Sequence, residues 1–319
     1  MTRVAVLDDY QGRAHEYADW SSLGDEVEVT FFREPIADGA LAATLADYQI
    51  LVLMRERTAF PRQVLEQLPA LRFVVTTGMG NASVDLAYLR ERGIPMSGTQ
   101  GARPESGVSS TAEVAWALIF ATTKRVGVED RAIRAGGWQL GLPTPLAGAT
   151  LGLAGLGRLG SEMVAPARAF GMSVLAWSPN LSEERAAAAG VERVTKEELL
   201  RRSDVLSIHL VLGDRSRGLF TAADLALMKR TAVLVNTSRG PIVDEAALLG
   251  ALASGTIAAA GLDVYDREPL PADHPLRAAE NAVLLPHVGY ANEDNFRVMY
   301  GHAVEDIRGF LSGAPVRLI

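Results

Sequence analysis

The segment that begins at Thr150 constrains the fold of this 319-residue chain more than any other part of the sequence. An apolar run, Thr150–Ala154, leads into the glycine pattern Gly155-Leu-Gly-Arg-Leu-Gly160, then into a helix-like stretch and a second apolar run, Ser173–Trp177. This order of strand, glycine-rich turn, helix and strand is typical of a βαβ unit that binds a dinucleotide. We therefore predict such a unit here, with Pro166 kinking its helix.

Each glycine of the pattern has a physical task. The first permits the tight turn, the second lets the backbone approach a pyrophosphate, and the third lets the helix pack closely on the strand. Polar groups at the ends of later strand-like runs, among them His209 and Thr237, extend this candidate site. The candidate cofactor contacts from these patterns are Gly155, Gly157, Arg158, Leu159, Gly160, Ser178, His209 and Thr237.

The second strand of this unit does not end in an acidic residue. A carboxylate at that point would accept hydrogen bonds from the ribose hydroxyls and would repel a 2′-phosphate. Ser178 stands there instead, and the nearest arginine downstream is Arg185. The sequence therefore does not enforce NAD, and it neither excludes NADP nor actively selects it.

Short apolar runs alternate with amphipathic stretches along the rest of the chain, which indicates βαβ units and mostly parallel sheets with helices on both faces. The expected strands are Val4–Leu7, Val27–Phe31, Ile50–Leu53, Phe73–Thr76, Thr150–Ala154, Ser173–Trp177, Val205–His209, Ala232–Asn236, Ala258–Leu262 and Val283–Leu285. The expected helices include Phe60–Leu68, Val84–Arg92, Ser110–Thr123, Lys196–Arg202, Thr221–Met228 and Asp244–Ser254. The strands form two groups, separated by the turn-rich segment Gly98–Gly107, so we predict an α/β fold with two sheets.

Composition and charge exclude several classes of protein. The chain has no cysteine, which excludes disulfide scaffolds, thiolate zinc sites, iron–sulfur clusters and cysteine nucleophiles. Its net charge of −7 argues against a nucleic-acid groove binder. The first apolar run is too short for a signal peptide, and no apolar stretch approaches 18 residues. We expect a cytoplasmic protein without a metal, nucleic-acid or membrane partner.

A second group of polar residues follows the later strand-like runs. Arg239, Glu268 and His287 each come after such a run, at what would be its carboxyl end. In an open α/β sheet, ligands bind at that edge. An arginine, a carboxylate and a histidine at one edge exceed what packing requires, so we interpret them as a candidate catalytic set.

These motifs together resemble the D-isomer-specific 2-hydroxyacid dehydrogenases, which include phosphoglycerate, glyoxylate/hydroxypyruvate and formate dehydrogenases. The resemblance rests on Val74–Leu86, on the glycine pattern, and on the spacings of 29 and 19 residues that separate Arg239, Glu268 and His287. It implies two doubly wound domains, Rossmann-like or flavodoxin-like, with a cleft between them. Residues 1–100, completed by 289–319, would bind the substrate, and residues 101–288 would form an inserted NAD(P)-binding domain.

The resemblance also implies roles for single residues. Arg239 would bind the substrate carboxylate and keto oxygen, and His287 would be the acid/base held by Glu268. Arg55, Met79 and Gly80 would bind the substrate, the last two through their backbone, and Asp263 would contact the nicotinamide amide. The helix that begins near Ser110 would contribute to a homodimer interface.

The chemistry of a 2-keto acid supports these roles independently. Its reduction needs a hydride and a proton, and histidine suits the proton step because its ordinary pKa lies near neutrality. A neighbouring carboxylate favours the imidazolium and fixes the tautomer. An arginine fork binds a carboxylate through two parallel hydrogen bonds and stabilises the charge that develops on the oxygen.

Two alternatives stay open at this point. A dinucleotide-sensing corepressor of the same fold would keep a similar Arg–Glu–His set, and a turnover assay would separate it from an enzyme. A formate-type dehydrogenase would share the loop Asp263–Arg277, although that branch carries Gln in place of Glu268. The chain also has Thr76 where the phosphoglycerate branch has a second phosphate-binding arginine, so we expect 3-phosphoglycerate to be a poor substrate. The sequence does not name the 2-hydroxy acid, the direction of the reaction or the preferred dinucleotide.

Overall fold

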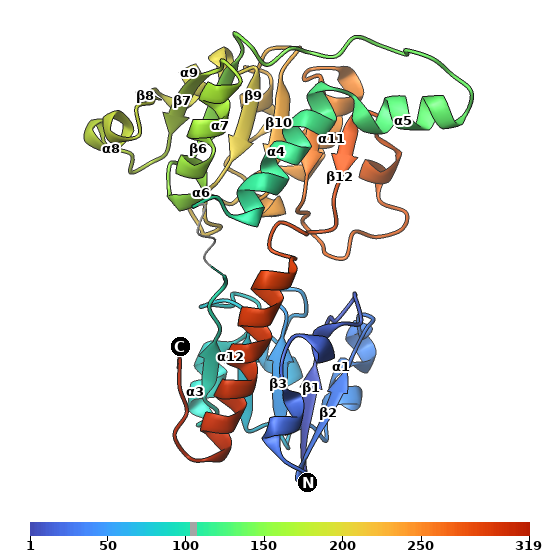
Figure 1. Ribbon diagram of the computed structural model, residues 1–319, viewed down its shortest axis with the longest axis vertical. Coiled ribbons are helices and arrows are strands. Elements are labelled where there is room, and N and C mark those ends of the chain that lie inside the picture. Colours follow the sequence, from blue (N-terminus) through green and yellow to red (C-terminus); the bar gives the residue numbers. More distant parts are fainter. Residues whose placement is uncertain (103–106) are drawn as a thin grey trace. The chain divides into compact units, whose positions relative to one another are not determined.

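The computed structural model describes residues 1–102 and 107–319, so the expected boundary at Gly98–Gly107 lies partly outside the described residues. The chain divides into two compact units, Met1–Arg103 with Ala291–Ile319, and Pro104–Tyr290 (Figure 1). Each unit has its own parallel sheet, which confirms the predicted fold class.

The first unit contains a five-stranded parallel sheet in its described part, in the order β2-β1-β3-β4-β5. Its middle strands are buried along their whole length, which explains their almost uninterrupted apolar sequence. Three helices cover one face, and the long α12 covers the other, where Phe310 stacks on Phe73 of β4 at 4.5 Å. The elements are β1 (Thr2–Val6), β2 (Val27–Phe31), α1 (Asp38–Leu45), β3 (Ile50–Leu53), α2 (Arg62–Leu65), β4 (Phe73–Thr76), α3 (Leu86–Glu91), β5 (Met96–Gly98) and α12 (Glu293–Leu311).

The second unit contains a seven-stranded parallel sheet in its described residues, in the order β12-β11-β10-β9-β6-β7-β8. Helices α4 and α7 pack on one face, and α9, α10 and α11 pack on the other. The strands are β6 (Thr150–Ala154), β7 (Ser173–Trp177), β8 (Glu192–Arg193), β9 (Val205–Ile208), β10 (Val233–Asn236), β11 (Ala259–Leu262) and β12 (Ala282–Leu284). The helices are α4 (Ser110–Thr123), α5 (Val126–Arg134), α6 (Arg158–Glu162), α7 (Val164–Ala169), α8 (Glu183–Ala188), α9 (Lys196–Arg202), α10 (Ala222–Leu225) and α11 (Glu245–Ser254).

The order of strands in this sheet reverses between β6 and β9, whose neighbours continue in opposite directions along the sheet. Such a switch point leaves a crevice outside the carboxyl ends of the strands, and ligands bind there in open α/β sheets. The glycine-rich turn follows β6 directly, so the fold delivers the strongest sequence motif to this position.

Local signals explain several of the helix bounds. Thr195 and Glu198 form a capping box at the start of α9, and Asp244 caps α11 by accepting a hydrogen bond from the Ala247 N–H. The helix after the turn is interrupted at Met163, between α6 and α7, near the predicted position of the kink. Pro166 has no N–H to donate to the carbonyl four residues earlier, which ends α6 at Glu162.

Several elements were not among the expected ones, including α1 and α5. β8 is an exposed edge strand of two charged residues, Glu192 and Arg193, and β5 has only three residues, so neither forms an apolar run. α8 is short and rich in alanine. α12, by contrast, carries a signal in the sequence, because its buried residues follow the helical period, at Phe296, Met299, Tyr300, Ala303, Val304 and Ile307.

Within the part of the chain that the structure describes, no helix has both the length and the apolar character needed to cross a membrane.

Candidate functional site

The glycine-rich turn is tightly packed on one side and open on the other. Gly155 has φ +105°, and a Cβ there would lie 2.4 Å from the His209 carbonyl oxygen. A Cβ on Gly160 would lie 2.1 Å from the Gly155 carbonyl oxygen. A Cβ on Gly157 would meet no described atom within 4 Å. The turn therefore needs glycine where backbone meets backbone, and it leaves open space at the position expected to face a pyrophosphate.

Two buried polar atoms at the neighbouring strand ends support binding of a polar group here. His209 follows β9 and shares a 2.9 Å hydrogen bond between its Nε2 and the Ser207 hydroxyl. Burial lowers the pKa of His209 to about 4, so the ring is neutral near pH 7. Its Nδ1 and the Thr237 hydroxyl, after β10, are buried and find no hydrogen-bond partner in the described residues. Buried polar atoms normally have hydrogen-bond partners. A dinucleotide bound at this edge would give these two atoms such partners, so it fits the site.

The helix after the turn carries a charged pair next to the site. Arg158, an exposed residue at the start of α6, donates a 2.9 Å hydrogen bond to Glu162. The other oxygen of Glu162 accepts hydrogen bonds from the backbone N–H and the hydroxyl of Ser109, at 2.9 and 2.5 Å. Glu162 therefore links the helix of the glycine-rich turn to the start of α4, a contact that the sequence did not reveal.

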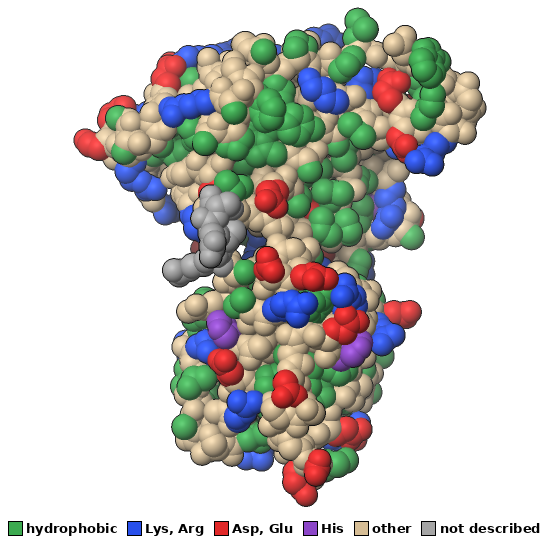
Figure 2. All heavy atoms as spheres, viewed as in Figure 1, with side chains coloured by type: hydrophobic (Ala, Val, Ile, Leu, Met, Phe, Trp, Pro, Cys, Tyr) green, Lys and Arg blue, Asp and Glu red, His purple; other side chains and the backbone are tan. Residues whose placement is uncertain are grey.

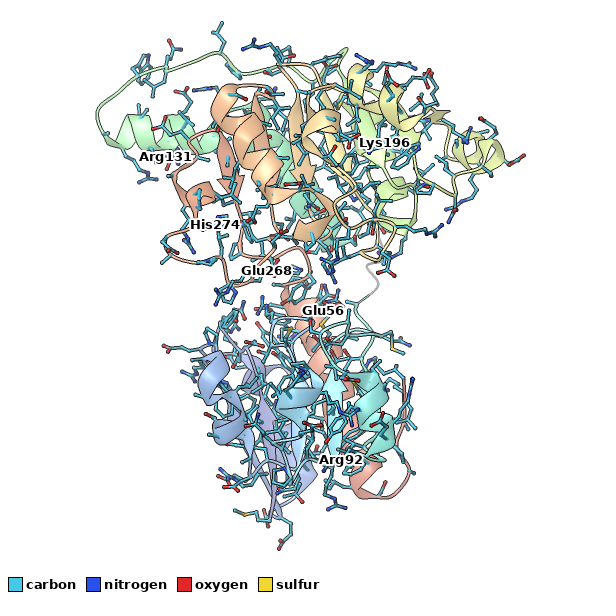
Figure 3. The ribbon with its side chains drawn as sticks, turned by 180° about the vertical axis from the view of Figure 1, so that it is seen from behind. Glu56, Arg92, Arg131, Lys196, Glu268 and His274 are labelled. Carbon is cyan, nitrogen blue, oxygen red and sulfur yellow. The ribbon has the colours of Figure 1, made fainter. Side chains whose placement is uncertain are left out.

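His287 and Glu268 are in direct contact. The Nδ1 atom of His287 lies 2.5 Å from one carboxylate oxygen of Glu268, and the other oxygen accepts a 3.0 Å hydrogen bond from the Tyr265 N–H. Both side chains are mostly buried. Because a carboxylate only accepts, Nδ1 carries the hydrogen, and Nε2 is left to act on a ligand. Figure 3 shows Glu268 on the long loop that follows β11.

Asp263 holds the backbone that follows His287. Its two carboxylate oxygens accept hydrogen bonds from the N–H groups of Val288 and Gly289, both at 2.8 Å. Asp263 is almost fully buried, and burial raises the pKa of its carboxyl. Tyr265, on the same loop, donates to the Leu285 carbonyl at 2.9 Å. The loops after β11 and β12 are thus fastened to each other around the His287–Glu268 pair.

Arg239 lies just past β10, at the same edge of this sheet. Its Nη1 donates to the Ser238 carbonyl at 2.7 Å, and its own carbonyl accepts a hydrogen bond from the Asn236 amide at 2.9 Å. The next residue is Gly240, where a Cβ would lie 2.0 Å from the Tyr265 carbonyl carbon. The Arg239 turn therefore packs directly against the loop that carries Glu268.

The expected substrate residues of the first unit lie together at the carboxyl ends of β3 and β4. The backbone N–H of Arg55 donates to the Thr77 hydroxyl at 2.9 Å, and Asn81 donates to the Arg55 carbonyl at 2.6 Å. Between Thr77 and Asn81 in the sequence, Met79 is 55% exposed, and a Cβ on Gly80 would meet no described atom within 4 Å. The loop therefore presents a short stretch of backbone at the edge of its sheet.

The candidate residues fall into two groups, one in each unit. In the second unit, the Arg239 turn, Glu268, His287 and Asp263 are joined by the contacts above, and the glycine-rich turn with Ser178, His209 and Thr237 lies at the carboxyl edge of the same sheet. In the first unit, the loop of Arg55 after β3 is hydrogen-bonded to the loop of Met79 and Gly80 after β4. The sequence did not reveal the hydrogen bonds of Glu162 with Ser109 or the hydrogen bond from Arg185 to the Leu156 carbonyl, since neither Glu162 nor Arg185 belongs to a motif.

Comparisons with known proteins agree on one family. Residues 116–289 match the model of the D-isomer specific 2-hydroxyacid dehydrogenase NAD binding domain. The chain is 41% identical over 266 residues to a glyoxylate reductase of Aeropyrum pernix, which covers 80% of this chain and 78% of that protein. It is 31% identical to a hydroxypyruvate reductase of Blautia hydrogenotrophica, over 99% of both chains. The crystal structure of a putative D-3-phosphoglycerate dehydrogenase oxidoreductase from Ralstonia solanacearum superposes with a TM-score of 0.92 at 36% identity, covering 100% of this chain and 96% of that one.

Proposed function

Since this chain belongs to the D-isomer-specific 2-hydroxyacid dehydrogenase family and is an NAD(P)-dependent oxidoreductase, we propose that Arg239, Glu268 and His287 perform its chemistry on a small 2-keto or D-2-hydroxy acid. The observation that carries this proposal is the His287–Glu268 contact of 2.5 Å, at the sheet edge that also holds Arg239 and the glycine-rich turn. The relatives reported above carry the names of reductases and dehydrogenases, which favours an enzyme over a corepressor.

His287 moves the proton. Glu268 accepts the hydrogen on Nδ1, which fixes the ring and stabilises the imidazolium. In the direction of reduction, Nε2 then gives its hydrogen to the oxygen of the keto group, and in the direction of oxidation it takes the hydrogen back. When bound, the reduced dinucleotide would supply the hydride that the carbonyl carbon needs.

Arg239 binds the acid and stabilises the charge that develops on the keto oxygen. A guanidinium can bind a carboxylate through two parallel hydrogen bonds and still direct a donor toward a neighbouring oxygen. The 2.7 Å hydrogen bond from Nη1 to the Ser238 carbonyl orients the group. In the first unit, we propose that Arg55 and the backbone at Met79 and Gly80 bind the carboxylate of the substrate.

The dinucleotide would be held by the glycine-rich turn and by the polar groups beside it. Gly155, Gly157, Arg158, Leu159 and Gly160 would receive the pyrophosphate at the start of α6. Ser178, His209, Thr237 and Asp263 would contact the two nucleosides. Because Ser178 is uncharged, we propose that NAD(H) and NADP(H) are both accepted.

The direct test of this function is turnover of a panel of 2-keto acids with NADH and NADPH, followed by loss of absorbance at the nicotinamide band. We expect glyoxylate, hydroxypyruvate or pyruvate to be reduced, and 3-phosphoglycerate to be a poor substrate in the reverse assay. Thr76 is fully buried and accepts a hydrogen bond from Asn81 at 3.0 Å, so Arg55 has no second cation at that position to help bind a phosphate dianion. A kcat/KM for 3-phosphoglycerate above the values for these three acids would contradict this expectation.

Glu268→Gln tests the catalytic pair. The amide keeps the size of the side chain but removes the negative charge beside His287, so the imidazolium loses stabilisation. We expect the basic limb of the pH profile of kcat/KM for reduction to move to lower pH, while the fold is retained by circular dichroism. An unshifted limb would mean that His287 is not the titrating acid or that Glu268 is not its partner.

We further propose that the protein is a homodimer formed through α4 and the arm that follows it. After α4, α5 and the next segment extend away from the sheet of their unit (Figure 1). The arm exposes large apolar side chains, including Trp138 (74%) and Leu142 (92%). Hydrophobic side chains also gather on the surface near α4 and α7 in Figure 2, where Phe120 and Phe170 are in edge contact. In a two-fold symmetric dimer, the same surface patch of both chains forms the interface. An exposed apolar patch of this kind is suited to that role.

Sedimentation equilibrium measures this directly, and we expect twice the mass of one 34.1 kDa chain. Trp138→Glu combined with Leu142→Glu places charges in the patch and should yield a monomer at micromolar concentration. Leu311→Glu, which adds one charge at a 41% exposed site in the other unit, is the control and should leave the dimer intact. A wild-type monomer, or a dimer that survives the double substitution, would contradict the proposed interface.

A further inference from the structure

Arg185 reaches from α8 to the glycine-rich turn. Its Nη2 donates a 3.0 Å hydrogen bond to the carbonyl of Leu156, the residue between the first two glycines of the pattern. The sequence separates these two residues by 29 positions and gives Arg185 no place in the motif. In the structure its guanidinium group is a neighbour of the turn.

The same corner contains the end of β7. The Gly155 N–H donates to the Trp177 carbonyl at 2.8 Å, so the turn and the residue before Ser178 are directly bonded. After Ser178 the chain folds back, because the Ser178 carbonyl accepts from the Leu181 N–H at 3.2 Å and the Ser182 hydroxyl caps α8 by accepting from the Arg185 N–H at 3.3 Å. Arg185 is therefore bonded to the turn directly, and Ser178 follows a residue that is bonded to it. In this fold, the end of the second strand is where the adenosine ribose is bound.

One acidic side chain that would repel an anion is absent from this corner, and another is paired. Ser178 replaces the carboxylate that would repel a 2′-phosphate. Of the two acidic residues on α8, Glu183 is bonded to Arg193 at 2.8 Å, while Glu184, whose pKa is lowered by a hydrogen bond from Ser182, keeps its negative charge. The Leu156 hydrogen bond uses one N–H of the Arg185 guanidinium, which has five such donors in a fork that matches phosphate geometry.

We propose that Arg185 binds the 2′-phosphate of NADP(H) and makes this enzyme prefer the phosphorylated dinucleotide. The proposal builds on the dinucleotide site of the proposed function and adds the residue that selects between its two ligands. A neutral serine alone would leave the two dinucleotides nearly equivalent. An arginine held against the turn gives the 2′-phosphate a charge-assisted contact that the ribose hydroxyl of NAD lacks.

The test compares two nucleotide fragments that differ at the ribose, adenosine 2′,5′-bisphosphate and adenosine 5′-monophosphate, by isothermal titration calorimetry on the full-length protein. We expect the wild type to bind the bisphosphate more tightly. Arg185→Gln should weaken the bisphosphate about ten- to hundredfold and change the monophosphate less than about twofold. Arg185→Lys should restore part of the difference, and kcat/KM for NADPH and NADH should follow the same order.

Two further variants complete the experiment. Arg168→Gln removes an arginine that also binds backbone carbonyls, those of Ala189 and Gly190, but does not contact the glycine-rich turn, and it should leave both fragments unaffected. Ser178→Asp adds a negative charge at the proposed site and should weaken the bisphosphate selectively.

The outcomes separate this inference from the proposed function. If Arg185→Gln weakens both fragments equally, Arg185 only shapes the turn, and the inference is wrong. If it weakens neither, or if the wild type does not prefer the bisphosphate, the inference is also wrong. If neither fragment binds, the proposed dinucleotide site and this inference are both wrong. If the preference is found but no keto acid is reduced, the substrate assignment fails and the role of Arg185 stands.

Discussion

Replacing His287 with alanine is expected to lower kcat for keto-acid reduction by about 10²–10⁴-fold, the usual contribution of a positioned acid or base. Its Nδ1 is bonded to Glu268, so alanine removes the proton donor and leaves a mostly buried carboxylate behind. Binding of the dinucleotide should survive, because Gly155–Gly160 lies on a different βα turn. Steady-state kinetics and calorimetric titration with NADPH measure the two effects separately.

A second histidine–carboxylate pair provides the control. His274 lies further along the loop that carries Glu268 (Figure 3), and its Nε2 is 3.0 Å from a carboxylate oxygen of Glu245 on α11. Its Nδ1 accepts a backbone hydrogen bond from Leu276, so both ring nitrogens are used within the fold. We expect His274→Gln to reduce thermal stability while changing kcat by less than about tenfold. A His287→Ala enzyme that kept more than a tenth of its kcat would contradict the proposed role.

The fold was largely predictable because buried parallel strands leave a direct signal in the sequence. β3, β4, β6 and β7 have the bounds expected from their apolar runs, since both faces of each sheet are covered. The signal disappears at edges. β8 consists of Glu192 and Arg193 and is recognised only from its pairing with β7.

The candidate site was predictable to the extent that its residues follow strands. Arg239 and His287 follow β10 and β12, and parallel strands bring their carboxyl ends to one edge. The supporting contacts were not predictable, because they depend on how loops fold back. Asp263 binds the N–H groups of Val288 and Gly289, 25 and 26 residues later, and no local pattern specifies that pairing. The contact of Arg185 was not predictable for the same reason, since its long side chain reaches from α8 to the Leu156 carbonyl on another element.

Arg239→Lys is expected to reduce kcat/KM for a good keto acid by about 10²–10³-fold. The ammonium keeps the charge but cannot form two parallel hydrogen bonds with a carboxylate while directing a donor to the keto oxygen. The backbone should be unaffected, because Gly240 and the Asn236 amide, which bonds the Arg239 carbonyl at 2.9 Å, hold the turn without the side chain. The loss should therefore appear in kinetics with no change in thermal stability.

Chemical rescue separates a direct role of the guanidinium from an indirect one. In an Arg239→Ala enzyme, added guanidinium chloride should restore part of kcat/KM, because the small cation can occupy the vacated position beside the substrate carboxylate. Sodium chloride at the same ionic strength controls for screening. Arg277→Lys is the matched substitution, since Arg277 binds the Leu270 and Pro271 carbonyls at 2.7 Å on the surface, and it should cost less than about threefold. Full activity of Arg239→Lys, or an Arg239→Ala enzyme that guanidinium does not rescue, would show that the side chain does not bind the substrate.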